Sequence, residues 1–388
     1  MKKHCLLAVS AAILTVTAAS AQTRSFKTGQ WIEIQNAILK ELNRSYVDSL
    51  PLDRIERAGI DAMLEALDPY TVYVPEEEQE DFEMMIGKTY GGIGAIIYKP
   101  EKEGNVFINE PYAGSPAVRA GLQAGDQLLE IDGVTVHGLE AAECSDRMKG
   151  KPGTTVHFKV QKVRTGEIVE IDVRRERIHL PDVEYYGMLN DRDGYILQTG
   201  FTENVSGDIR NAYHELKKQG MERLVLDLRG NGGGLMSEAV NIVSLFVPKG
   251  SLVVSQKGRD EADVREYRTV MEPVDTEIPI IVLVDGGSAS SSEIVTGALQ
   301  DLDRATVMGR RTYGKGLVQR VATFAEDGAG MQYTSEQYFT PAGKNIQGVG
   351  VTPDVVVDSD FINVSGEPDV ESDVQLQAAM EVVREEIE

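Results

Sequence analysis

The most informative stretch of this chain reads Pro279-Ile-Ile-Val-Leu-Val284, then Asp285-Gly-Gly-Ser-Ala-Ser-Ser-Ser-Glu293, and then shows a helical pattern up to Leu299. The first part is short, apolar and β-branched, which is typical of a strand buried on both faces. The second part is a turn of small residues that leads into the helix. This order places the serines of the turn at one end of a sheet, with Ser290 at the start of the helix.

A lysine-containing loop follows this helix. After a predicted strand at residues 304–308 comes Gly309-Arg-Arg-Thr-Tyr-Gly-Lys-Gly316. A serine hydroxyl is a weak nucleophile unless a base removes its proton. Of the histidines, only His179 and His214 border this region, and neither sits in a glycine-framed turn. Burial can lower the pKa of a lysine until its neutral amine serves as the base. We therefore predict that Ser290 is a nucleophile and Lys315 its base.

Two other interpretations of these residues are open. Gly309-x4-Gly314-Lys315 comes near a phosphate-binding loop, but Gly316 stands where such a loop needs Ser or Thr to hold Mg²⁺. The run Ser290-Ser-Ser-Glu293 fits a capping box, in which the two side chains satisfy backbone donors at a helix start. A cap and a nucleophile are compatible, because the amides at a helix N-terminus also stabilise a developing oxyanion.

A second strand–turn–helix unit precedes the first. It consists of Leu224-Val-Leu-Asp-Leu228, the turn Arg229-Gly-Asn-Gly-Gly-Gly234 and the helical pattern Leu235–Phe246. Two such units predict a parallel-rich α/β core over residues 180–355, with both glycine turns at one end of the sheet. Residues 356–388 are expected to be an acidic C-terminal tail with a short amphipathic helix that packs on the core or on another subunit.

Short strands and turns dominate residues 89–176. This region contains Gly91-Gly-Ile-Gly94, Gly114-Ser-Pro-Ala-Val-Arg-Ala-Gly-Leu122 and Gly125-Asp-Gln-Leu-Leu-Glu-Ile-Asp-Gly133. It resembles a PDZ domain, and residues 114–133 are close to the signature of that family. The resemblance implies capture of a peptide C-terminus, in which the peptide adds as a strand to the sheet edge. The implied carboxylate-binding groups are the backbone N–H groups of Gly91, Gly92, Ile93 and Gly94.

The N-terminus has the pattern of a targeting segment. Lys2 and Lys3 precede the apolar run Leu6–Val16 and the small residues Ala19-Ser20-Ala21, so residues 1–21 are expected to be a cleaved signal peptide. The alternative is a single anchoring helix, although the run is short for a bilayer. Residues 26–88 show apolar residues at helical spacing and are expected to be a small helical segment, with its last helix at residues 76–85.

Composition restricts the function further. The 388 residues carry a formal net charge of −23 and no basic cluster, so binding to nucleic acid or to an anionic membrane surface is disfavoured. Removal of the signal leaves Cys144 as the single cysteine, and no internal disulfide is expected. No group of His, Cys and acidic residues has metal-ligand spacing, and we expect neither a metal nor another cofactor.

Taken together, these motifs resemble the carboxyl-terminal processing (tail-specific) serine proteases. The resemblance implies a multidomain α/β and α+β protein: a helical segment, a PDZ domain and a crotonase/ClpP-like α/β protease core. It places Ser290 at the family's nucleophile, Lys315 at its general base and Gln319 at the residue that orients the base. The implied oxyanion hole consists of the N–H groups of Gly233 and Ser291, and the implied supporting positions are Arg229, Glu293, Asp301 and Thr312. Relatives usually have alanine where this chain has Ser291.

The implied function is a serine endopeptidase that cleaves proteins near their C-termini through an acyl-enzyme. The PDZ domain would bind the substrate C-terminus and could gate the site. Export to the periplasm or cell envelope is expected, and a homo-oligomer or an activator protein is left open. One alternative is a non-catalytic PDZ scaffold that only binds peptides. Another is acyl-CoA chemistry, in which glycine-rich amides polarise a thioester and no Ser–Lys pair is needed.

Overall fold

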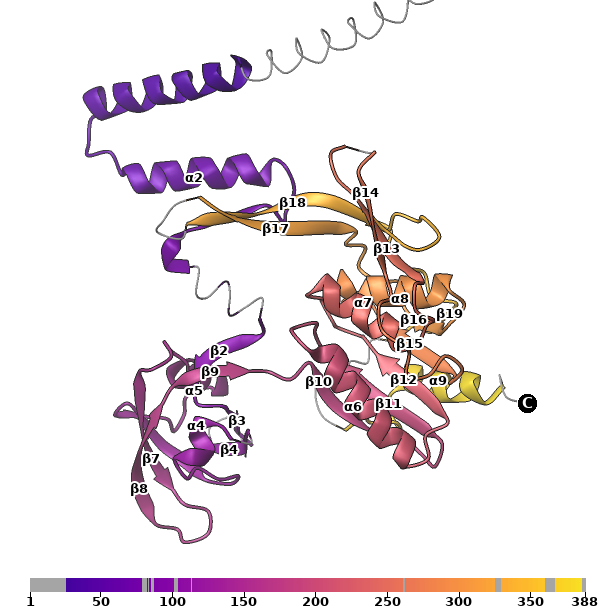
Figure 1. Ribbon diagram of the computed structural model, residues 1–388. Coiled ribbons are helices and arrows are strands. Elements are labelled where there is room, and N and C mark those ends of the chain that lie inside the picture. The colour runs from indigo at the N-terminus through magenta and orange to yellow at the C-terminus, as the bar shows by residue number, and fades with distance from the viewer. Residues whose placement is uncertain are drawn as a thin grey trace, which may run out of the picture. The chain divides into compact units, whose positions relative to one another are not determined.

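The computed structural model describes residues 26–78, 82, 84, 87–100, 104–112, 114–260, 262–324, 329–359 and 367–385 (Figure 1). The chain divides between Pro69 and Tyr70 into two compact units. The predicted signal peptide, residues 1–21, lies outside the described residues. Among the residues that are described, no helix is both long enough and apolar enough to span a bilayer.

The N-terminal unit contains two helices (Figure 1), one at residues 26–45 and α2 at Leu52–Glu65. The Gln35 amide donates a hydrogen bond to the Glu56 carboxylate at 3.5 Å, which places the two helices side by side. The predicted helical spacing is thus confirmed for this part. Much of the apolar surface of the unit is nevertheless exposed, including the side chains of Trp31, Ile38 and Met63.

The rest of the segment assigned to residues 26–88 differs from the prediction. A short 3₁₀ helix, η1 (Glu76–Glu78), begins where a helix over residues 76–85 was expected, and much of that range lies outside the described residues. Just before it, β1 (Val72–Val74) is a strand rather than part of a helical segment. It pairs antiparallel with β18, with Val72 opposite Gln332. The β-branched side chains of Val72 and Val74 favour this conformation, and Val74 is buried in the pairing.

Residues 89–179 form the region that was predicted to be a PDZ domain. β2 (Thr89–Gly92) pairs antiparallel with β9 (Glu176–His179), so the two ends of the domain are joined. A second sheet has the order β3-β4-β5-β7-β8, with β6 paired to β5. Its strands are β3 (Ala95–Tyr98), β4 (Val106–Pro111), β5 (Gln127–Ile131), β6 (Val134–Thr135), β7 (Thr155–Gln161) and β8 (Ile168–Arg174). The helices are α4 (Pro116–Arg119) and α5 (Ala141–Met148). Val106, Leu128 and Phe158 lie in the buried core that the strands and helices of this region enclose.

The predicted α/β core is built on a sheet with the order β10-β11-β12-β15-β16-β19. These strands are β10 (Val183–Met188), β11 (Asp193–Gln198), β12 (Arg223–Asp227), β15 (Ile280–Val284), β16 (Thr306–Gly309) and β19 (Val355–Val356). All neighbouring pairs are parallel except β10 with β11. The two predicted strand–turn–helix units therefore lie side by side, and both glycine turns follow the carboxyl ends of adjacent strands.

Helices cover both faces of this sheet. One face packs against α6 (Val205–Lys218), α7 (Met236–Ser244) and α8 (Ser291–Asp301). The other face packs against α9 (Val374–Glu385), whose Leu376 and Ala379 are fully buried. The expected C-terminal helix thus packs on the core. Alternate residues of the buried strands point to the two faces, so the strands read as continuous apolar runs.

A smaller sheet has the strand order β1-β18-β13-β14, in which neighbouring strands are hydrogen-bonded, and β17 also pairs with β18. It contains β13 (Leu252–Lys257), β14 (Val264–Arg268), β17 (Leu317–Thr323) and β18 (Gly330–Phe339). β17 begins two residues after Lys315, so the lysine loop leads directly into this sheet.

Candidate active site

Ser290 occupies a sharp bend between β15 and α8. Its backbone angles are φ 57° and ψ −115°, a conformation that residues with a side chain rarely adopt. Such strain persists only where the surroundings hold it. Here the Ser290 N–H donates to the Glu293 carboxylate at 2.8 Å, and the Tyr338 hydroxyl donates to the Ser290 carbonyl at 3.1 Å. The Glu293 half of the predicted capping box is therefore present.

Glu293 joins the two predicted catalytic residues through their backbones. Its fully buried carboxylate accepts the N–H groups of Ser290 and Lys315 on one oxygen, each at 2.8 Å. The other oxygen accepts the Thr312 hydroxyl at 2.6 Å and the Gly314 N–H at 2.7 Å. Four donors and the N-terminus of α8 compensate the buried charge. The serine turn and the lysine loop are thus fixed to each other by one side chain.

Lys315 is half-buried in its loop. Burial lowers the pKa of its amine below the ordinary value, while the charge of Glu293 opposes part of that effect. The Lys315 Nζ lies 4.6 Å from the centre of the Tyr70 ring. No hydrogen bond joins this Nζ to the Ser290 hydroxyl, although both side chains are described. The backbones of the two predicted catalytic residues are therefore held together, while the Lys315 amine faces an aromatic ring.

The turn after β12 lies against Ser290. Gly233 has φ 97°, and a Cβ on it would come within 2.8 Å of the Ser290 Cβ and 2.9 Å of the Ser291 amide nitrogen. Only glycine can approach so closely. The Gly233 N–H, however, donates to the Asn231 side-chain oxygen at 2.9 Å. The predicted oxyanion donor Gly233 thus lies beside the predicted nucleophile, Ser290, and its N–H is hydrogen-bonded inside its own turn.

The other three serines of the run are structural. Ser288, Ser291 and Ser292 are buried, and each donates its hydroxyl to a carbonyl of the glycine turn after β12. The bonds are Ser288 Oγ to Leu228 O, Ser291 Oγ to Gly234 O and Ser292 Oγ to Asn231 O, each 2.8 Å long. The two glycine turns are therefore linked by three side-chain hydrogen bonds.

Asn231 is a buried residue of this site that the sequence did not single out. Its carbonyl accepts the Ala289 N–H at 3.0 Å as well as the Ser292 hydroxyl. Its side-chain amide donates to the Gln198 carbonyl at 2.9 Å. The available signal was its position, since its polar side chain stands between the glycines of a turn that follows a buried strand.

Two of the supporting positions act away from the dyad. The Arg229 guanidinium bonds to the Asp227 and Asp373 carboxylates, with the shortest contacts at 2.6 Å. Although burial disfavours the charged form, these carboxylates hold the pKa of Arg229 above its usual range. Asp301, at the far end of α8, accepts the Lys344 ammonium at 2.7 Å and the Ala342 N–H at 2.9 Å. Arg229 thus anchors the C-terminal segment, and Asp301 anchors a neighbouring turn.

The structure brings Thr312 into the site but leaves Gln319 apart from the lysine amine. Thr312 is buried, and its hydroxyl bonds to Glu293 while accepting the Val351 N–H at 2.7 Å. Gln319 lies on β17, and its side-chain amide donates to the Thr334 hydroxyl at 3.4 Å. It makes no hydrogen bond with Lys315 within the described part of the chain.

A groove crosses the PDZ domain between β3 and α5. It is lined by Ala95, Ile96 and Ile97 of the strand, by Ala141, Ala142 and Ser145 of the helix, and by Tyr90, Tyr112 and Lys149. β3 is an edge strand of its sheet. Of the four predicted carboxylate-binding residues, Gly91 and Gly92 lie in β2 and pair with β9, Ile93 is buried in the PDZ core, and Gly94 has φ 71° where the chain enters β3.

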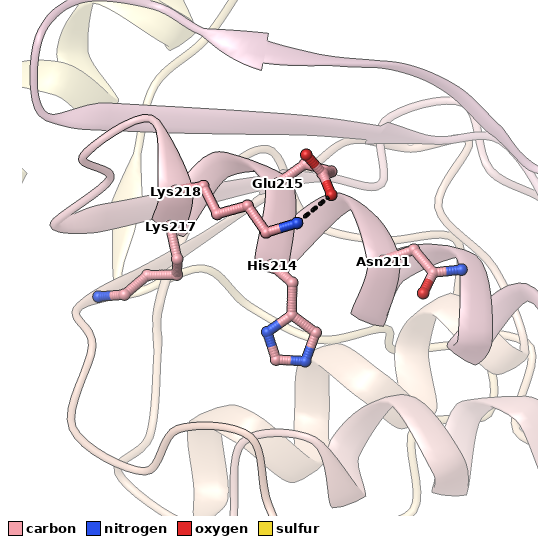
Figure 2. Close-up of a pocket in the computed structure, with 5 residues that line it drawn as sticks. All are labelled: Asn211, His214, Glu215, Lys217 and Lys218. Carbon is pink, nitrogen blue, oxygen red and sulfur yellow. Dashed lines mark hydrogen bonds and ion pairs between the residues drawn. The ribbon is translucent and has the colours of Figure 1, made fainter.

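A separate hollow lies on the outer side of α6 (Figure 2). Asn211, His214, Glu215, Lys217 and Lys218 line it, all with exposed side chains, and Lys218 pairs with Glu215 at 2.7 Å. None of the predicted site residues borders it. The two linked glycine turns and the lysine loop are therefore the candidate active site.

Two parts of the chain match known protein families. Residues 192–357 match peptidase family S41, and residues 107–162 match the PDZ domain family. A "Probable CtpA-like serine protease" of Staphylococcus aureus is 36% identical over 329 residues, which is 84% of this chain and 64% of that protein. The chain thus spans less than two thirds of the length of the curated relatives it matches.

Two solved structures are also similar. The photosystem II D1 C-terminal processing protease is 31% identical, with 84% of this chain and 88% of that chain covered and a TM-score of 0.48. A Bacteroides fragilis protein described as a "Putative S41 protease" is 17% identical, with 84% and 90% covered and a TM-score of 0.53. The second likeness supports the fold alone.

Proposed function

The chain belongs to peptidase family S41, and we therefore propose that it is a serine endopeptidase that cleaves protein or peptide substrates near their C-termini. The observation that carries the proposal is the buried Glu293 carboxylate, which holds the backbone N–H groups of Ser290 and Lys315 on one oxygen. The serine turn and the lysine loop are thereby held in a fixed position relative to each other. A Ser–Lys dyad needs such a fixed frame, because effective proton transfer requires a well-defined distance between hydroxyl and amine.

In the proposed mechanism, the neutral Lys315 amine turns toward Ser290 and takes the hydroxyl proton as the serine oxygen attacks the scissile carbonyl. The N–H of Ser291 and an N–H of the turn Gly232–Gly234 stabilise the oxyanion. Lys315 then passes the proton to the leaving amine, and an acyl-enzyme forms. Water, deprotonated by the same lysine, releases the acyl group.

The PDZ groove is the proposed binding site for the substrate C-terminus. A peptide would extend the sheet at β3, with its side chains against the small residues Ala141, Ala142 and Ser145 of α5. Movement of this domain could regulate access to the site. The two chain segments that flank this domain offer a point of control. Lys88, before the domain, has φ 47°, and its amine lies 3.3 Å from the buried carboxylate of Asp182, which follows the domain.

The remaining parts of the proposal concern the setting of the enzyme. The targeting pattern of residues 1–21 supports export to the periplasm or cell envelope. The exposed apolar side chains of the N-terminal unit support assembly into a homo-oligomer. An activator protein that opens the PDZ domain is compatible with a gated site.

The function is tested by incubating the protein with an unstructured polypeptide and identifying the products by mass spectrometry. We expect internal cuts near the C-terminus, and we expect Ser290→Ala and Lys315→Ala each to abolish them without changing thermal unfolding. Lys218→Ala, on the outer side of α6, is the control and should cleave normally. Peptide binding without cleavage by the unaltered protein would instead indicate a non-catalytic scaffold. Near-normal turnover by Lys315→Ala would overturn the dyad.

A further inference from the structure

Tyr70, at the start of the larger compact unit, contacts the Lys315 amine through its ring. The Lys315 Nζ lies 4.6 Å from the centre of the Tyr70 ring, within the range of a cation–π contact. Both residues are half-buried. Tyr70 lies outside the predicted core of residues 180–355, and no motif of the sequence singled it out.

Tyr70 is held in place by the small sheet. The Gln332 side chain donates to the Tyr70 carbonyl at 3.2 Å, and the Thr334 N–H donates to the Thr71 hydroxyl at 3.2 Å. Two residues further on, β1 pairs with β18. The ring is thus supported by the same strand, β18, that pairs with the strand following Lys315. Its position beside the amine is built into the sheet.

The other groups near the lysine set its electrostatic surroundings. From α8, Glu293 faces it as a buried carboxylate that favours the ammonium form. From β18, the Tyr338 hydroxyl donates to the Lys315 carbonyl. On its own loop, Tyr313 has a largely exposed side chain. Glu293 is occupied by four donors from the backbone and Thr312, and none of these contacts is with the amine.

We propose that Tyr70 is a positioning residue for Lys315, whose ring face holds the ammonium form of the base away from Ser290. The proposal rests on the proposed function, in which the neutral amine must face the serine. A ring quadrupole attracts a cation and has little hold on a neutral amine. Loss of the proton therefore frees the side chain to turn toward the Ser290 hydroxyl, and regain of the proton returns it to the ring.

The test measures the titration of Lys315 directly. Full-length protein is labelled with a trace of acetic anhydride at a series of pH values, and modification of the Lys315 peptide is followed by mass spectrometry. In Tyr70→Leu we expect the midpoint to fall by about 0.5–1 pH unit, because a cation–π contact no longer favours the ammonium. Tyr70→Phe keeps the ring and should titrate as the unaltered protein does. Tyr313→Leu removes an exposed aromatic ring of the same loop and should leave the midpoint unchanged.

A second readout is the pH profile of cleavage. Its acid limb should move to lower pH in Tyr70→Leu by the same amount, whereas a purely structural role would lower the rate at all pH values. If Tyr70→Leu fails to fold, replacement of the ring by a pentafluorophenyl group keeps its shape and reverses its quadrupole, and the same downward shift is expected. An unchanged midpoint with a folded protein overturns the proposal. If Lys315→Ala still cleaves, the Ser–Lys dyad of the proposed function fails, while the labelling result still reports on the Tyr70 contact.

Discussion

Glu293 sits at the first turn of α8 and accepts hydrogen bonds from both sides of the dyad. A carboxylate can accept all four donors, because each oxygen offers two lone pairs. A glutamine amide has one acceptor oxygen, and its NH₂ group would face donors. At this residue the geometry of the site depends on a buried negative charge whose four donors all come from the protein.

We expect Glu293→Gln to lower kcat on the order of 100-fold, equivalent to about 2.7 kcal/mol, because two of the four donors lose their acceptor. The measurement is steady-state cleavage together with a thermal unfolding curve. Glu381→Gln, at an exposed position of α9, is the matched control. A variant that cleaves normally would show that the dyad does not need this carboxylate.

Ser291 contributes a side chain as well as an amide. Its hydroxyl holds the Gly234 carbonyl at 2.8 Å, a bond that alanine could not make. We expect Ser291→Ala to reduce kcat about fivefold, the cost of one hydrogen bond of about 1 kcal/mol, with KM unchanged. Comparison with Ser251→Ala, whose hydroxyl donates to the Pro248 carbonyl elsewhere, controls for the loss of a hydroxyl. A change in KM alone would argue against a role in holding the oxyanion turn.

The proposed role of Lys315 as the base predicts how cleavage depends on pH. Burial lowers its pKa below the ordinary value of 10.5, and the base is active only when neutral. Activity should therefore rise with pH through this lowered pKa and fall about tenfold per pH unit on the acid side. A kcat/KM profile from acidic to alkaline pH measures it. A profile that is flat through the range in which Lys315 titrates would contradict the assignment.

Much of the site could be predicted from residue types, and part of it could not. Ser290 and Lys315 stand out because each lies in a turn framed by small residues. The engagement of the Gly233 N–H by Asn231, and the contact of Lys315 with Tyr70, depend on side-chain directions and on pairing between distant segments. No local pattern encodes either of these.

At the scale of elements, the two strand–turn–helix units were predictable because their apolar runs are continuous and their turns rich in glycine. β1 was not, since three residues carry too little periodicity and their partner strand is far along the chain. The C-terminal helix was expected from the helical spacing of its apolar residues, but the buried ion pair that holds its N-terminal end was not. Asp373 lies just before α9, and its carboxylate holds Arg229, directly beside the glycine turn of the site.

We expect Asp373→Ala to destabilise the protein by about 3 kcal/mol, because a buried guanidinium loses one of its two carboxylates. Chemical denaturation measures the free energy of unfolding. Glu381→Ala, an exposed acidic residue on the same helix, should change it little. Equal stability of the two variants would mean that Asp227 alone satisfies Arg229.

At the scale of the whole molecule, the surface of the N-terminal unit is more apolar than we expect for a pair of helices that is surrounded only by water. Trp31 is 68% exposed and Ile38 is 53% exposed. Exposed apolar surface of this kind marks interaction sites. The unit is also too small to bury these residues in a core of its own.

We expect the protein to form dimers or larger oligomers in sedimentation experiments, and Trp31→Lys combined with Ile38→Lys to shift it toward the monomer. Glu33→Lys changes the charge of the same helix without removing apolar surface, and it should leave the mass unchanged. A monomeric unaltered protein would show that this surface serves another purpose.

The pairing of β1 with β18 has a consequence for biosynthesis. Tyr70 and its contact Gln332 are separated by 262 residues, with the whole PDZ domain between them. At about 5–20 residues per second, a ribosome adds those residues in roughly 13–50 seconds. Throughout that interval the nascent strand has no partner, and the lysine loop at residues 309–316 is made only near its end. The contact between Tyr70 and Gln332 can therefore form only late in synthesis, after β18 has been made.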